Sequence, residues 1–275
     1  MKKGKWLIYF VLILAVAVMT IPFLWMLLTS FKTFEDSTKI SAADSSGTMD
    51  FDKLHGNFGS VSYSKMVYEF YFSGCYFTAR TGVSGLARCV CICKTSFSGK
   101  KNFLFMLMLS IMMIPEQIFI IPRYNTLAAV GLTNTRVALW IVRLFSVFAV
   151  FMMRQFILSV PRELDEAAMI DGCGPFRIFW NVLLPLLRPI LGVVALFQFR
   201  HTWNDYITSS VFTMTQPDLR PLTVGVVQLK YGASAAAEWN LMMAGAAISI
   251  IPMLLVYFVC NKYFMNGVTE GSVKG

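Results

Sequence analysis

The sequence is poor in charge, in histidine and in nucleotide-binding motifs, and each shortage excludes a class of protein. Charged residues make up 14% of the chain, against about 25% in an ordinary soluble domain, which excludes a soluble fold. The chain has two histidines, which are few for the catalytic site of a membrane-embedded enzyme. It contains no G-x4-G-K-[ST] phosphate loop, so we expect the chain itself to hydrolyse no ATP.

A nucleic-acid-binding surface is also missing, although the net charge is +9. No polar element carries the stripe of basic and aromatic residues that such a surface needs. The basic residues lie instead at the ends of apolar runs, as Lys2, Lys3 and Lys5 do before Trp6–Leu28. Cytoplasmic anchoring of membrane helices places lysine and arginine in this way. The sequence therefore predicts a membrane protein with no nucleic-acid partner.

Hydrophobic residues make up 56% of the chain, and most fall into runs long enough to cross a bilayer as helices. The first run is longer than the apolar core of a signal peptide, so we interpret it as a retained span. We predict an all-α polytopic membrane protein, a single transmembrane domain over 1–275, with six transmembrane helices expected. The predicted spans are about 6–28, 67–93, 103–122, 137–158, 186–212 and 239–260, with a loop at 159–185.

The span at 67–93 is required by topology and not by hydropathy. Charged residues interrupt this part of the chain, among them Glu69, Arg80 and Arg88. If the N-terminus is cytoplasmic and this span is missing, the loop at 159–185 and the C-terminus both lie outside. With the span present, both termini and that loop are cytoplasmic, which is what we expect.

The same stretch holds Cys75, Cys89, Cys91 and Cys93. The usual zinc pairs are C-x2-4-C, and no His or Asp stands at ligand spacing, so we predict no metal site. Codons for residues 88–93, shifted by one nucleotide, permit Ala-Ala-Tyr-Ala-Phe-Ala. We hypothesise that roughly residues 60–93 are written in a shifted reading frame, which degrades the second span. A divergent extracytoplasmic loop is the alternative, and the nucleotide sequence distinguishes the two.

The most informative segment, residues 166–185, has the sequence EAAMIDGCGPFRIFWNVLLP. It is polar and broken by glycine, although it lies between apolar stretches. Proline and acidic residues from Pro161 onward favour the start of a helix, and Gly172 favours its end. We predict a second helix over Phe176–Leu184 that ends before Pro185.

The residue spacing of this segment resembles the cytoplasmic signature of permease subunits of bacterial ATP-binding-cassette importers. The spacing is E-A-A, three residues, Gly, nine residues, Val, one residue and then Leu-Pro. Val182 stands where that pattern has Ile. Further segments resemble the carbohydrate-uptake branch of the family, which includes maltose, multiple-sugar and glycerol-phosphate systems. These segments are Ile114–Gln117, Arg154–Phe156, Trp203–Tyr206, Met243–Ala246 and Gly271–Gly275. Within that branch the chain is similar to the second of two paired permeases, the one with six spans.

The resemblance implies a sugar importer in the bacterial plasma (inner) membrane, driven by ATP bound to partner subunits and needing no cofactor of its own. The implied partners are a second permease, two ATP-binding-cassette ATPase subunits and an extracytoplasmic sugar-binding protein. The loop would act as a coupling helix that docks on an ATPase. The docking residues that the resemblance implies are Glu166, Ala167, Ala168, Asp171, Gly172, Leu184 and Pro185.

Polar residues in the fifth predicted span are candidates for the substrate pathway, because polar groups at membrane depth usually face the bundle interior or water. These candidates are Arg200, Trp203, Asn204, Asp205 and Tyr206. Trp and Tyr also anchor helices at membrane interfaces. Asp205 could instead cap a kink, or pair with Arg200 and His201. We interpret Glu116 and Arg143 as packing or loop-end charges.

Two other functions remain open at this point. A secondary transporter would not need the loop at 159–185, and it usually shows internal repeats and paired intramembrane acids, which are not evident. A non-functional product would result if the frame shift in 60–93 is genuine.

Overall fold

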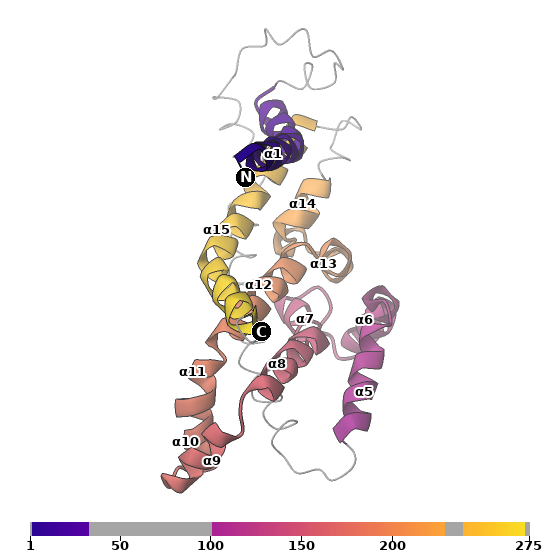
Figure 1. Cartoon of the computed structure of the whole chain (residues 1–275). Helices are drawn as coiled ribbons and strands as arrows, with labels where there is room; N and C mark the ends of the chain where they lie inside the picture. Colours follow the sequence, from indigo (N-terminus) through magenta and orange to yellow (C-terminus); the bar gives the residue numbers. More distant parts are fainter. Residues whose placement is uncertain (1, 33–100, 229–238, 273–275) are drawn as a thin grey trace. The chain divides into compact units, whose positions relative to one another are not determined.

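The computed structural model describes residues 2–32, 101–228 and 239–272. Every regular element in these ranges is helical (Figure 1), which confirms the all-α class. The predicted span at 67–93 and the proposed frame-shifted segment lie outside the described residues. The chain divides into two compact units, Met1–Val67 with Pro221–Pro252 and Tyr68–Arg220 with Met253–Gly275.

The first unit contains two long apolar helices and a short one. α1 is Lys2–Ser30, α14 is Leu222–Gln228, and α15, Trp239–Ser272, begins here and ends in the second unit. A Cβ added to Gly245 of α15 would meet the Val226 side chain of α14 at 2.5 Å. Small residues allow membrane helices to approach closely, so Gly245 makes room for α14.

The second unit is built from short helices joined by tight turns. They are α5 Lys101–Met112, η1 Glu116–Phe119, α6 Ile120–Ala129, α7 Arg136–Ile141, α8 Val147–Ser159, α9 Glu163–Ile170, α10 Pro175–Ile178, η2 Phe179–Leu183, α11 Leu184–Leu186, α12 Arg188–Trp203, α13 Tyr206–Phe212 and η3 Pro217–Leu219. Three of them have side-chain N-caps. Thr135 accepts from the Ala138 N–H before α7, Ser146 accepts from the Ala149 N–H before α8, and Asp205 caps α13. Such caps stabilise a helix start by satisfying an unpaired N–H.

Two helices are long and apolar enough to cross a membrane without a break, Lys5–Ser30 and Trp239–Asn261. They correspond to the spans predicted at 6–28 and 239–260. Two bent pairs pass the same test, Phe105–Met112 with Glu116–Ala129 at 95° and Pro175–Leu186 with Arg188–Trp203 at 70°. The described helices therefore supply two spans, or up to four if each bent pair is one span. Six spans stay a prediction.

The other two predicted spans are interrupted. The stretch 137–158 holds α7 and α8, which are separated at Val142–Ser146. The stretch 186–212 holds α12 and α13, which are separated at Asn204 and Asp205. The first break holds the buried Arg143, and the second holds the half-buried Asp205.

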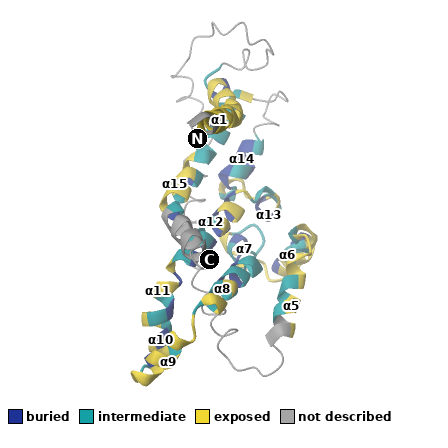
Figure 2. Ribbon diagram, viewed as in Figure 1, coloured by how far each residue is buried: buried dark blue, intermediate teal, exposed yellow. Residues whose placement is uncertain are grey.

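The core of the second unit lies where α8 packs on α12 (Figure 2). It is formed by Ala149 and Met153 of α8, together with Leu187, Ile190 and Val194. A second cluster joins α6, α7 and α13 through Leu127, Ala138, Leu139 and Phe212. These two clusters hold the helix breaks in place, and the site residues described next lie at those breaks.

Candidate functional site

The predicted first helix of the loop is α9, and its ends follow from local sequence. Its first turn carries Glu163, Asp165 and Glu166, whose charges favour a helix N-terminus. After its C-terminal end, Gly172 has a φ of +78°. The Gly172 N–H donates to the Met169 carbonyl at 3.0 Å, and the Cys173 N–H donates to the Ala168 carbonyl at 2.9 Å. This is a Schellman turn, which favours glycine at the left-handed position. The predicted helix stop at Gly172 is confirmed.

We expected the second helix of the loop to end before Pro185, and this prediction is wrong. α10, η2 and α11 run without interruption from Pro175 to Leu186. Proline lacks the N–H that an α-helix needs. The π-helical turn Phe179–Leu183 just before it changes the hydrogen-bond register, and the Leu187 N–H bonds the Leu183 carbonyl at 2.9 Å. The helix therefore passes through Pro185 and stops at Leu187, where α12 begins.

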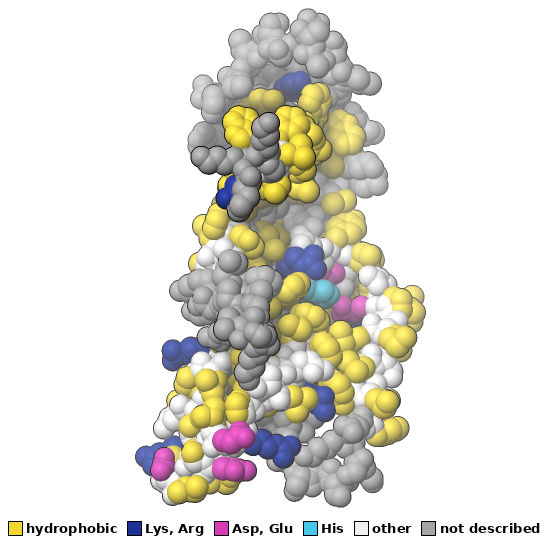
Figure 3. Space-filling model, in the orientation of Figure 1, with side chains coloured by type: hydrophobic (Ala, Val, Ile, Leu, Met, Phe, Trp, Pro, Cys, Tyr) yellow, Lys and Arg dark blue, Asp and Glu magenta, His cyan; other side chains and the backbone are white. Residues whose placement is uncertain are grey.

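The loop exposes both charge and apolar bulk. Of the predicted docking residues Ala168 is buried and Leu184 is half-buried, while the exposed ones are Glu166, Ala167, Asp171, Gly172 and Pro185. Ile170 and Phe176 are 87% and 77% exposed, and the Phe176 ring stacks on Trp180 with centroids 6.3 Å apart. In Figure 3 acidic and basic side chains gather over this end of the unit. An acidic helix flanked by exposed apolar side chains is suited to docking a partner protein.

The predicted pathway residues lie around the break between α12 and α13. Trp203 is 3% exposed and its ring stacks on Phe199 with centroids 5.4 Å apart, so it contributes to packing. Asn204 and Arg200 are exposed, and Tyr206 is half-buried. The Arg200 guanidinium lies 5.9 Å from the centroid of the Phe197 ring. Contact of any of them with a cargo stays a prediction.

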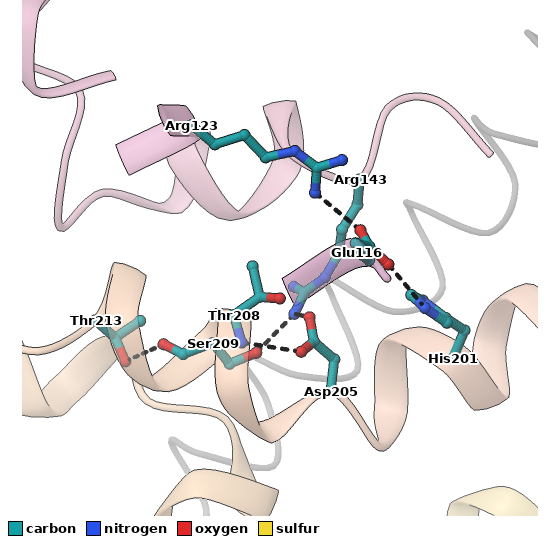
Figure 4. Close-up of polar contacts among 8 residues, drawn as sticks. All are labelled: Glu116, Arg123, Arg143, His201, Asp205, Thr208, Ser209 and Thr213. Carbon is teal, nitrogen blue, oxygen red and sulfur yellow. Dashed lines mark hydrogen bonds and ion pairs between the residues drawn. The ribbon is translucent and has the colours of Figure 1, made fainter. Parts of the chain in front are cut away.

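Asp205 is the centre of a buried polar cluster (Figure 4). Its Oδ1 accepts from the Thr208 N–H at 3.0 Å, so Asp205 is the N-cap of α13. This agrees with the alternative in which Asp205 caps a kink. Its Oδ2 accepts from Nη2 of Arg143 at 2.8 Å. The same Nη2 donates to Oγ of Ser209 at 2.6 Å. Arg143 thus ties the break between α7 and α8 to the break between α12 and α13.

The alternative in which Asp205 pairs with Arg200 and His201 is wrong, because the partner of Asp205 is Arg143. His201 bonds Glu116 instead, with Nε2 3.2 Å from Oε2, and Nη1 of Arg123 donates to Oε1 of Glu116 at 2.9 Å (Figure 4). Sequence reasoning missed this second cluster. A glutamate directly after a proline that interrupts an apolar run was the signal that could have located it.

Within the residues that the structure describes, no group of three or more His, Cys, Asp and Glu side chains is arranged to hold a metal ion. The cysteines at 75–93 lie outside those residues. The described residues of the site form an exposed loop and two charged clusters that are joined by ionic and hydrogen-bonding contacts.

Residues 95–270 match the family described as the binding-protein-dependent transport system inner membrane component. The chain belongs to this family. The match identifies it as a permease subunit in the inner membrane, with several spans, and as a transport component and not an enzyme. The predicted family is thereby confirmed, and a system of this kind includes a binding protein and an ATPase.

Curated relatives agree with this assignment. The permease is 28% identical over 286 residues to the probable ABC transporter permease protein YurM of Bacillus subtilis, covering 100% of this chain and 89% of the relative. It is 34% identical over 181 residues to the arabinooligosaccharides transport system permease protein AraQ of Halalkalibacterium halodurans, covering 65% of this chain and 63% of the relative.

Among solved structures, the permease resembles a chain of a bacterial ABC transporter involved in the import of the acidic polysaccharide alginate. The TM-score is 0.73, with 20% identity, over 95% of this chain and 97% of that chain. At this identity the likeness establishes the fold.

Proposed function

We propose that this permease carries a sugar or an oligosaccharide across the plasma membrane. In this proposal it forms half of the translocation pathway with a second permease. Two ATPase subunits on the cytoplasmic side, which is also the side of both termini, drive the transport. An extracytoplasmic sugar-binding protein delivers the cargo. Support comes from relatives named for arabinooligosaccharides and for sn-glycerol-3-phosphate, which are 34% and 31% identical over their alignments.

The observation that carries the proposal is the exposed loop built by α9 and α10. Its acidic first turn, its Schellman turn at Gly172 and its exposed Ile170 and Phe176 form a surface that the described residues leave uncovered. A partner groove that receives this surface would bury apolar area and meet the acidic end of α9. This is the role of a coupling helix that docks on an ATPase.

The loop is also placed to transmit movement. α9 packs on α10 and on η2, and the helix from Pro175 to Leu186 leads into α12 through a 70° bend at Leu187. A push on α9 therefore reaches α12 through packed helix and not through a flexible linker. Rigid-body tilting of packed helices is how such interfaces switch between two states.

We also propose that Arg200, Asn204, Asp205 and Tyr206 border the pathway, with Trp203 as packing support. Arg200 and Asn204 are exposed, and the helix break at Asn204 gives the chain an irregular backbone. Irregular backbone at membrane depth is tolerated where it is buried in protein or lines a water-filled cavity. Asp205 would act through the position of α13, because both of its oxygens are occupied.

Co-purification of the ATPase with the tagged permease tests the proposal. Glu166→Lys reverses a charge on the exposed face of α9, and Gly172→Asp puts a side chain on a left-handed residue, where L side chains are strained. Each change is expected to lower ATPase recovery about tenfold or more, as loss of a central contact does. Asp218→Lys, the same kind of charge reversal on exposed η3, is the control and should leave recovery unchanged.

The outcomes separate the alternatives. ATPase that stays bound to both variants would overturn the docking role of the loop. Uptake by the wild-type permease with no ATPase partner would favour a secondary transporter. Failure of the wild-type permease to assemble would favour a non-functional product.

A further inference from the structure

The cluster of Glu116, Arg123 and His201 is open to solvent, unlike the other charged cluster of the unit. The Glu116 and Arg123 side chains are 43% and 35% exposed, and that of His201 is 56% exposed. In Figure 3 a histidine side chain lies open on the surface with acidic side chains beside it, surrounded by hydrophobic residues. Three ionisable groups thus form an uncovered polar patch on an apolar face.

The patch lies on segments with the composition of membrane spans. Glu116 and Arg123 belong to one bent helix pair and His201 to the other, and each pair passes the hydropathy test for a span. Glu116 follows directly after Pro115, at the 95° bend. Ionisable groups at membrane depth are costly when they face lipid, so they face protein or water. Broken helices at that depth obey the same rule.

Among the described residues, the Arg143–Asp205 pair is covered by protein, whereas the Glu116 cluster is partly exposed. The Glu116 cluster also retains hydrogen-bonding capacity. Of the three guanidinium nitrogens of Arg123, Nη1 bonds Glu116, which leaves Nη2 and Nε as donors. Each carboxylate oxygen of Glu116 makes one contact, with Arg123 or with His201, and can accept a second hydrogen bond. A dry interface with another subunit would leave this capacity unpaired, at a free-energy cost.

We propose that Glu116, Arg123 and His201 line the translocation pathway and hydrogen-bond the hydroxyl groups of a carbohydrate cargo during its passage. This inference rests on the proposed function. A sugar hydroxyl both donates and accepts, so it can give its proton to Glu116 and accept one from Arg123. An anionic cargo is less well matched, because the Glu116 carboxylate already neutralises the Arg123 guanidinium that would attract it. The patch therefore favours a neutral, polyhydroxylated cargo.

Cysteine accessibility tests the location of the patch without knowledge of the cargo. His201→Cys and Arg123→Cys are made in the full permease after its native cysteines are changed to Ser, and assembled with the ATPase in membrane vesicles. The probe is a sulfonated, membrane-impermeant maleimide. Ile118→Cys and Ile121→Cys are the matched controls, because these side chains are exposed on the same segment and apolar.

Residues 201 and 123 are expected to react at least about tenfold faster than residues 118 and 121, because only water-facing thiols ionise and meet the probe. The rates at 201 and 123 should change when the ATPase is trapped with ATP and vanadate. Equal, slow labelling at all four positions in an assembled complex would overturn the inference. Absence of the ATPase from the complex would instead overturn the proposed function.

Uptake tests the chemistry of the patch. A panel of radiolabelled neutral oligosaccharides and their uronic-acid counterparts is given to cells that express the whole transporter. For a sugar that wild type takes up, Glu116→Gln is expected to lower initial uptake about tenfold, the loss expected of one charged hydrogen bond. Ile118→Val serves as the control. Unchanged uptake in the Glu116→Gln variant, or transport of uronates alone by wild type, would contradict the proposal.

Discussion

Two charged clusters in the same unit have similar chemistry and opposite surroundings. Arg143 and Asp205 have side chains 5% and 14% exposed, and they join two helix breaks by a hydrogen-bonded pair. Glu116, Arg123 and His201 also join two elements, but their side chains are 35% to 56% exposed. Burial turns the first cluster into a structural link. Exposure leaves the second free to bind something that this unit does not supply.

The largest effect that would sharpen this comparison is expected from Arg143→Met. The substitution leaves the Asp205 carboxylate buried without its charged partner, which costs about 3–5 kcal/mol of unfolding free energy. Unfolding of the purified permease in mixed detergent and SDS micelles measures it. Arg188→Met, an exposed arginine at the start of α12, should change stability by less than about 0.5 kcal/mol. Equal losses in the two variants would contradict a special role for the buried pair.

A smaller loss is expected from Asp205→Asn. The amide oxygen can still accept from the Thr208 N–H and cap α13, but the charge that faces Arg143 is gone. The cost is about 1–3 kcal/mol, that of a weakened hydrogen bond to a charged group. The same micelle unfolding measures it. If Asp205→Asn were as damaging as Arg143→Met, the capping bond and not the ion pair would be the important contact.

The double variant Arg143→Met with Asp205→Leu should recover most of the loss. Replacing both members of a buried ion pair by apolar residues is often close to neutral, and here the lost N-cap of α13 remains. We expect stability within about 1–2 kcal/mol of wild type, through a coupling energy that a double-mutant cycle quantifies. Additive losses would mean that the two side chains act independently.

The smallest effect on stability is expected from Glu116→Gln. Exposed ion pairs contribute about 0–1 kcal/mol, so the unfolding free energy should stay within that range. Uptake should fall at the same time, as argued above. A permease destabilised as strongly as the Arg143→Met variant would show that the open cluster is structural, and the comparison between the clusters would break.

The part of the site that sequence predicted is the part that local forces build. The acidic first turn of α9 and the glycine at its end determine a short helix and a turn within a few residues of each other. Pro185 shows the limit of local rules. Proline usually stops a helix, but a π-helical turn just before it kept the helix continuous to Leu186.

The partner of Asp205 could not be found in this way. Arg200 and His201 would be costly if they faced lipid at membrane depth, which suggested Asp205 as their partner. The helix ends at Trp203, so the break turns Asp205 toward Arg143, 62 residues earlier in the chain. His201 instead forms an ion pair with Glu116, which belongs to the other bent helix pair.

The amino-acid sequence by itself determined the membrane class, the family signature and the short helix and turn that open the loop at 159–185. Hydropathy, charge placement and residue spacing act along the chain, and a linear pattern records them. Tertiary structure alone decided which charges are buried and which are open. Burial depends on which helices pack together, and contacts between residues far apart in the chain leave no spacing to detect. For that reason the sequence did not reveal that Glu116, Arg123 and His201 form an open cluster in the folded chain.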